Sequence, residues 1–153
     1  MLGKQEKKEM NTRFWKDFKK SMRKEKSISA KKTNWVNYPT QINHLYLRMI
    51  CEKSTSLNFD IQIKDEEIRD LIWQQLIELK VVLENSMNYP STWTKNFYTK
   101  EGICISRISW ENKNLSLYDE TQWSEIHSFL KQRILGFDKF YQEFKDILIH
   151  LLK

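Results

Sequence analysis

The feature that most constrains the fold is a pair of alternating segments joined by a short polar connection. In residues 44–51 and again in residues 57–64, apolar side chains alternate with polar or amphipathic ones. Side chains of a strand point alternately to its two faces, so each segment has one apolar face. Because residues 52–56 are polar and few, the two segments predict an antiparallel hairpin with one face buried.

Helical periodicity accounts for most of the remaining chain. Residues 65–89 carry apolar residues at three- and four-residue steps after the capping residue Asp65, and residues from 121 to the end repeat this pattern. Gly136 is expected to bend or split this last helix. Strands are expected in the intervening part, at positions 93–98, 103–110 and, as a fifth strand of the sheet, 115–118.

These elements predict one α+β domain over residues 1–153, a size that can bury a real core. The expected architecture is an antiparallel sheet of four to five strands, with helices in the order α-ββ-α-ββ(β)-α and a long C-terminal helix. No run of about 18 apolar residues could span a membrane. The N-terminus lacks the apolar segment of a signal peptide, and we expect a cytoplasmic protein with two reduced, buried thiols, Cys51 and Cys104.

The net charge of +6 is concentrated at one end of the chain. Residues 1–32 hold twelve Lys and Arg against four acids, a balance of +8, whereas residues 33–153 hold 14 against 16, a balance of −2. Residues 6–24 predict an amphipathic helix, followed by a polar loop at 27–34. Its apolar face could meet a membrane surface or an acidic partner, but we expect it to dock on the core of the domain. The basic arm consists of Lys16, Lys19, Lys20, Arg23 and Lys24.

The common catalytic and cofactor motifs are missing from the sequence. The three histidines are scattered, and neither Cys-x-x-Cys nor His-Glu-x-x-His occurs. The three glycines stand alone, so no phosphate-binding loop is predicted, and no Gly-x-Ser-x-Gly marks a nucleophile. We therefore expect no metal and no cofactor, and an enzyme is the less favoured class.

The polar side of the predicted hairpin is the main candidate site. If it stays open it forms a groove, and if a helix covers it, it forms a buried polar network in which Arg48 pairs with Asp60. Asp60-x-Gln62-x-Lys64 is also similar to the pattern of metal-dependent nucleases, which needs a second carboxylate that only Glu52 could supply. A solvated strand face is the simpler interpretation of these three residues. The candidate binding residues are Tyr38, His44, Tyr46, Arg48, Asp60, Gln62 and Lys64.

Nucleic-acid binding is a further possibility, because basic residues beside aromatic ones can neutralise phosphates and stack bases. Tryptophans can equally be core anchors. Besides the basic arm, the residues that would take part are Trp35, Tyr38, Tyr46, Arg48, Trp93, Arg107 and Trp110.

The run from Trp35 to Met49, with its Asn-Tyr-Pro-Thr and His-Leu-Tyr-Leu-Arg segments, resembles a bacterial domain of unknown function. That domain is often found C-terminally in restriction-endonuclease-like or other nuclease-associated proteins. Phe14-Trp15-x-x-Phe18 and Trp123-x-x-Ile126-His127 fit the same pattern, so the resemblance runs from about residue 13 to the end. It implies an accessory or binding role and favours Tyr38, His44, Tyr46 and Arg48 as a matched cluster.

The sequence therefore favours a non-catalytic binding or interaction domain linked to DNA transactions or defence. Its expected partner is a protein or a nucleic acid. A homodimer is expected through the C-terminal helix, whose apolar stripe is longer than one small sheet can cover. The alternative is a degenerate metal-dependent nuclease of the restriction-endonuclease-like type.

Overall fold

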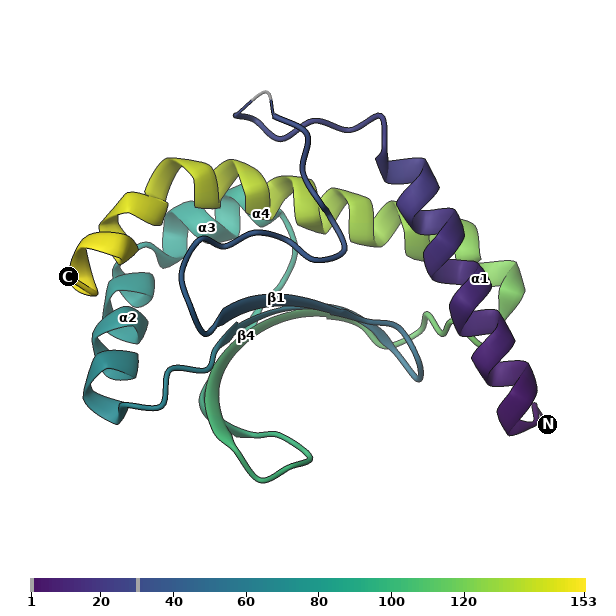
Figure 1. The fold of residues 1–153 in the computed structure, drawn as a ribbon, viewed down its shortest axis with the longest axis horizontal. Coiled ribbons are helices and arrows are strands. Elements are labelled where there is room, and N and C mark those ends of the chain that lie inside the picture. The colour runs from purple at the N-terminus through teal and green to yellow at the C-terminus, as the bar shows by residue number, and fades with distance from the viewer. Residues whose placement is uncertain (1, 30) are drawn as a thin grey trace.

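The computed structural model describes residues 2–29 and 31–153. Within them it confirms the predicted α+β class, an antiparallel sheet and a long C-terminal helix (Figure 1). The elements in chain order are α1 (Lys4–Met22), β1 (Leu45–Ile50), β2 (Thr55–Ile61), α2 (Glu66–Glu78), α3 (Lys80–Met87), β3 (Thr92–Tyr98), β4 (Cys104–Asn112), a 3-10 turn η1 (Glu120–Gln122) and α4 (Trp123–Leu151).

The sheet consists of two hairpins that meet through their second strands. Its order is β1-β2-β4-β3, and every neighbouring pair is antiparallel. The sheet is strongly curved, with α3 and α4 on its convex side and the tip of the β3–β4 hairpin curling beneath it (Figure 1). This order makes β2 a central strand, and its seven residues are all buried.

The core lies between the convex side of the sheet and α4. At its centre is Phe137, whose ring centroid lies 4.9 Å from that of Phe59 on β2 and 5.3 Å from that of Tyr141 on α4. Trp110 on β4 completes the contact at 6.4 Å. Aromatic rings at such spacings attract one another, and this attraction stabilises the fold in addition to the burial of their apolar surface. These contacts fix α4 across the sheet.

Helix α1 docks on the first half of α4, as expected. Phe14, Phe18 and Met22 are buried, and the ring of Phe14 lies 5.4 Å from Trp123 and 4.9 Å from His127. The apolar face of α1 is therefore used inside the domain, and its lysines face solvent. None of the helices in the described part of the chain is long and apolar enough to cross a membrane.

The structure corrects two expectations about the elements. The predicted single helix at 65–89 is two helices, because Leu79 leaves helical geometry (φ −94°, ψ 5°) and α3 turns to run along α4 (Figure 1). Residues 115–118 form no strand, although Leu117 donates its N–H to the Cys51 carbonyl at 2.7 Å. The described residues of the predicted loop at 27–34 form neither helix nor strand, and Ser27 at its start is buried, at 4% exposed.

Gly136 does not split α4, which is continuous over 29 residues. It lies instead at a close contact between α3 and α4. A Cβ added at Gly136 would lie 2.7 Å from the Ser86 carbonyl oxygen, and the Ser86 hydroxyl donates to the Gly136 carbonyl at 2.6 Å. This tertiary contact requires glycine there.

The apolar stripe of α4 is covered along most of its length by α1, α3 and the sheet. Its positions from Trp123 to Leu148 are largely buried, and Ile147 is its one large apolar residue in the described structure that is classed as exposed. The surplus of apolar surface behind the expected homodimer is therefore small.

Gly136→Ala should destabilise the fold although alanine is the better helix former. The new methyl group meets backbone atoms that cannot move independently, so we expect the free energy of unfolding to fall by about 2 kcal/mol. Gly3→Ala, whose Cβ would meet only the flexible Glu6 side chain, is the control and should cost less than about 1 kcal/mol. Urea denaturation measures both, and equal costs would contradict the close approach.

The two thiols should differ in reactivity. Burial, with a contribution from the neighbouring Glu52, raises the pKa of Cys51 to about 12, so at pH 8 almost none of it is the reactive thiolate. Cys104 is only half-buried, against the expectation of two buried thiols. Ellman's reagent at pH 8 should label Cys104 in the folded protein and Cys51 only after denaturation. Cys104→Ser should abolish the rapid phase, and two rapidly labelled thiols would contradict the burial.

Candidate functional site

The candidate site lies on the concave face of the sheet, away from α4. Phe59 points to α4, so its neighbour Asp60 points to the opposite face. In the register, Asp60 stands opposite Arg107 of β4, and Arg48 of β1 stands opposite Asn58, one diagonal step from Asp60. Directly opposed and diagonal side chains on one face lie within reach of one another. The strand order thus brings two arginines to one aspartate.

Both arginines bind the Asp60 carboxylate. Arg107 donates from Nε to Oδ1 at 2.7 Å and from Nη2 to Oδ2 at 2.9 Å, a two-pronged contact. Arg48 donates from Nη1 to Oδ2 at 2.8 Å and from Nη2 to the Gln62 side-chain oxygen at 3.0 Å. The Asp60 side chain is fully buried, whereas those of Arg48 and Arg107 are 38% and 15% exposed. One carboxylate is shared by two cations, so the cluster carries a surplus positive charge.

Each guanidinium also lies over an aromatic ring. The central carbon of Arg107 is 4.1 Å from the ring centroid of Phe97, and that of Arg48 is 4.5 Å from the ring centroid of Tyr46. Phe97 reaches this face because of an irregularity in β3. Thr94 stands opposite Arg107, so in a regular strand Phe97 would point the other way, and the β-bulge between the two residues restores it to the Arg107 face.

The two arginines form the floor of a hollow of about 540 Å³ inside the curl of the sheet. We call it the arginine hollow. The tip of the β3–β4 hairpin supplies its far wall with Lys100 and Glu101, and apolar side chains form its rim. The residues that line it are Arg48, Ile50, Gln62, Phe97, Tyr98, Thr99, Lys100, Glu101, Ile103 and Arg107.

The concave face thus combines the two alternatives that the sequence left open. Ser56, Asn58 and Asp60 of β2 are buried on this face, where the Asn58 amide donates to the Ser56 hydroxyl at 2.9 Å, although no helix in the described part of the chain covers them. Arg48 and Arg107 cover Asp60 and themselves face the hollow. Asp60 is therefore not a solvated strand residue, and burial comes from the curvature of the sheet and from neighbouring side chains.

Three of the predicted site residues lie outside this cluster. Tyr38 is on the other side of the sheet, where its ring lies 5.9 Å from Phe137. His44 precedes β1 with a positive φ of 70° and an exposed side chain, and its carbonyl accepts from the Gln62 N–H at 2.8 Å. Lys64 lies beyond the end of β2 and is exposed. Tyr46, Arg48, Asp60 and Gln62 are brought together as predicted.

Tyr38 belongs to a group of hydrogen bonds to Asp138 that hold the segment between α1 and β1 against α4. Asp138 of α4 is 2% exposed and accepts from the Tyr38 hydroxyl at 2.6 Å, the Ser27 hydroxyl at 2.8 Å and the Ile28 N–H at 2.8 Å. Burial, and after it the bond to Asp138, raises the pKa of Tyr38 above its ordinary value. The Tyr38 hydroxyl is therefore a neutral structural donor whose hydrogen is already used by Asp138.

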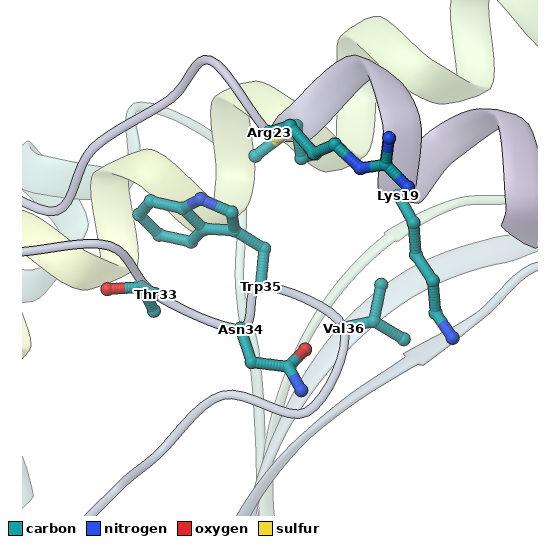
Figure 2. Close-up of a pocket in the computed structure, with 7 residues that line it drawn as sticks. Lys19, Arg23, Thr33, Asn34, Trp35 and Val36 are labelled. Carbon is teal, nitrogen blue, oxygen red and sulfur yellow. The ribbon is translucent and has the colours of Figure 1, made fainter.

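Two residues of the basic arm, Lys19 and Arg23, line a second, smaller hollow of about 240 Å³ between α1 and residues 33–36. Figure 2 shows Lys19 extending from the helix beside Val36, with Arg23 one turn further on and the Trp35 ring turned toward α4. All five arm residues are exposed, and none pairs with an acid among the described residues. Helix α1 ends at Met22, so Arg23 is its C-cap and Lys24 lies beyond it.

A third hollow, along the outer edge of β1, connects these two. It shares Val36 with the hollow at the arm and shares Arg48 and Ile50 with the arginine hollow. The three hollows are therefore neighbours, in a series from Lys19 and Arg23 over the edge of β1 to the concave face. Hereafter this series of hollows is called the basic track.

The structure does not provide the metal site that the nuclease alternative needs. Both Asp60 carboxylate oxygens accept hydrogen bonds from arginines, and Lys64 lies beyond the end of β2. Among residues 2–29 and 31–153, no group of three or more His, Cys, Asp or Glu side chains could hold a metal ion. Glu52, which the pattern needs as its second carboxylate, lies in the connection between β1 and β2, at the other end of the hairpin from Asp60.

The aromatic residues expected to stack bases divide into two groups. Trp35 and Trp110 are 4% and 0% exposed and serve the core. Trp93 is half-buried, and its ring lies 5.3 Å from Trp73. Tyr46 and Tyr98 are the accessible rings near the arginine hollow, at 38% and 67% exposed. Phe97 was not singled out from the sequence, because only the bulge in β3 brings its ring to the arginines.

Comparison with known proteins gives a family but no function. A family model described as a domain of unknown function, DUF4268, matches residues 10–145. The matched range includes the basic arm and every residue of the arginine hollow. No curated protein and no solved structure matches the chain significantly.

Asp60→Asn tests whether the shared carboxylate holds the cluster together. The amide leaves two guanidiniums without their counter-charge, and we expect the free energy of unfolding to fall by about 2–3 kcal/mol. The loss is below that of a fully enclosed pair because Arg48 reaches solvent. The control is Asp70→Asn, which removes an exposed pair with Lys95 and should cost less than about 1 kcal/mol. Similar losses in chemical denaturation would show that the cluster is not specially stabilising.

Proposed function

The chain belongs to the DUF4268 family, a domain of unknown function, and we propose that it is a non-catalytic binding domain for a single nucleic-acid strand. The strand would lie along the basic track, from the arm to the concave face of the sheet. The observation that carries this proposal is the arginine hollow, in which two arginines share one buried carboxylate on an open, aromatic-lined face. A role in DNA transactions within the cytoplasm is part of the same proposal.

Charge favours a polyanion as the ligand. The arm offers five exposed cations without acidic partners among the described residues, and Arg48, Arg107 and Lys100 line the hollow at the other end. Both ends are electropositive in a chain whose residues 33–153 carry a balance of −2. A polyanion releases its counterions on binding such a path, which supplies affinity without sequence preference.

Aromatic side chains favour a single strand over a duplex. Tyr46, which is 38% exposed, presents ring surface beside Arg48, and unpaired bases can stack on such a ring. In a duplex the bases are already stacked on one another and reach a curved sheet face only by their edges. The curl of the hairpin also narrows the approach to the floor of the hollow.

The geometry supports binding without catalysis. The Asp60 carboxylate, beneath the floor of the hollow, already accepts three hydrogen bonds from two arginines. It is therefore poorly placed to act as a general base or to bind a metal ion. The nearest acid in the lining is Glu101, at the hairpin tip.

Fluorescence anisotropy with labelled single-stranded DNA, single-stranded RNA and duplex DNA tests the proposal. We expect the single strands to bind more tightly at low salt. The double variant Lys19→Gln and Arg23→Gln should weaken binding by about tenfold. It should also reduce the slope of log affinity against log salt by about 1.4, because each phosphate contact on a single strand contributes about 0.7.

The matched control removes the same charge elsewhere, by Lys113→Gln and Lys139→Gln. Both lysines are exposed, and neither lines a hollow of the basic track. This control should keep the salt slope of the unmodified chain. If both double variants lose the same affinity, the effect comes from the net charge of the chain and not from the basic track. If no strand binds at low salt, the proposal is refuted.

A further inference from the structure

We infer that the floor of the arginine hollow is a discrete subsite for one phosphate group, with Arg48 and Arg107 as its ligand-binding residues and Asp60 as a positioning residue. The wider proposal of strand binding supplies the polymer to which this phosphate would belong. The subsite itself is argued from the cluster alone and does not depend on the arm.

The arginines retain donors for a ligand. Arg107 uses Nε and Nη2 on Asp60, and Arg48 uses Nη1 and Nη2 on Asp60 and Gln62. In the described structure no hydrogen bond uses Nη1 of Arg107 or Nε of Arg48. Neither atom is among the buried side-chain atoms that lack a partner, so these donors are accessible. A guanidinium with free N–H groups in one plane matches the oxygens of a phosphate.

The positions of the two guanidiniums are fixed before any ligand arrives. Asp60 holds both from below, and the rings of Phe97 and Tyr46 lie against their faces at 4.1 and 4.5 Å. A long arginine side chain usually loses much conformational freedom on binding, and a guanidinium already held in place loses less. Asp60 therefore favours phosphate binding by holding the two guanidiniums in place, although its own charge is negative like that of the phosphate.

The charge of the cluster selects an anion. Asp60 neutralises only one of its two arginines, and burial beneath them keeps its carboxylate from facing the ligand directly. Lys100 on the opposite wall adds another cation, and Glu101 beside it is the one acid among the described lining residues. The hollow is larger than one phosphate needs, and exposed Ile50 and Ile103 offer apolar surface to an attached sugar and base.

The test uses inorganic phosphate as the first probe, followed by NMR of the arginine side chains. Titration should shift the Nε–H signals of Arg48 and Arg107 saturably and leave that of Arg13 unchanged, since Arg13 lies on α1 in a pair with Glu120. Arg107→Lys keeps the charge but loses the two-pronged geometry, and we expect it to weaken phosphate binding by about tenfold or more. Arg13→Lys is the matched control and should have no effect.

Two further measurements cover the case of an unfolded variant and identify the kind of phosphate that binds. If Arg107→Lys perturbs the fold, seen as widespread changes in the amide spectrum, Lys100→Gln replaces it and should weaken phosphate binding severalfold. A 5′-phosphorylated oligonucleotide is then compared with its 5′-hydroxyl form. Tighter binding of the first assigns the subsite to a terminal phosphate, and equal binding that both lose with Arg107→Lys assigns it to a phosphodiester.

The outcomes separate this inference from strand binding. Absence of a saturable shift at Arg48 and Arg107, or an equal shift at Arg13, overturns the subsite even if oligonucleotides bind through the arm. Saturable phosphate binding that Arg107→Lys abolishes supports the subsite even if no oligonucleotide binds, and in that case the proposed strand binding fails.

Discussion

The contact on which the rest of the structure depends is that of Phe137 with the convex side of the sheet. Its ring meets Phe59 and Trp110 from the two central strands and Tyr38 from the segment before β1. This single position on α4 ties the helix, both hairpins and that segment together. Because α4 covers one side of the sheet so completely, polar residues of the strands can gather only on the other side.

That segregation explains the character of the concave face. A carboxylate as deeply buried as Asp60 is stable only with full hydrogen bonding and opposite charge, and two arginines from different strands supply both. The arrangement leaves one positive charge exposed in a hollow whose wall is the curled β3–β4 hairpin (Figure 1). Stability and a capacity to bind anions therefore arise from the same three side chains.

Much of the secondary structure was predictable because it depends on local periodicity. The β1–β2 alternation, the Asp65 cap and the apolar stripe of α1 were predicted correctly. The errors occur where a tertiary contact overrides local preference. Neither glycine nor proline marks the break at Leu79 in the sequence. Gly136, where sequence reasoning expects a bend or a break, permits the close approach of α3 to a continuous α4.

In the candidate site, too, some contacts follow from local sequence patterns and others only from the tertiary structure. The sequence by itself determined that Arg48 and Asp60 share the polar side of a hairpin, because alternation and a short turn settle the pairing of neighbouring strands. Only the tertiary structure decided that Arg107 and Phe97 join them, through the order β1-β2-β4-β3 and the bulge in β3. It also placed Tyr38 on the opposite side, against Asp138. Contacts between strands distant in the chain depend on sheet order and curvature, which no local pattern encodes.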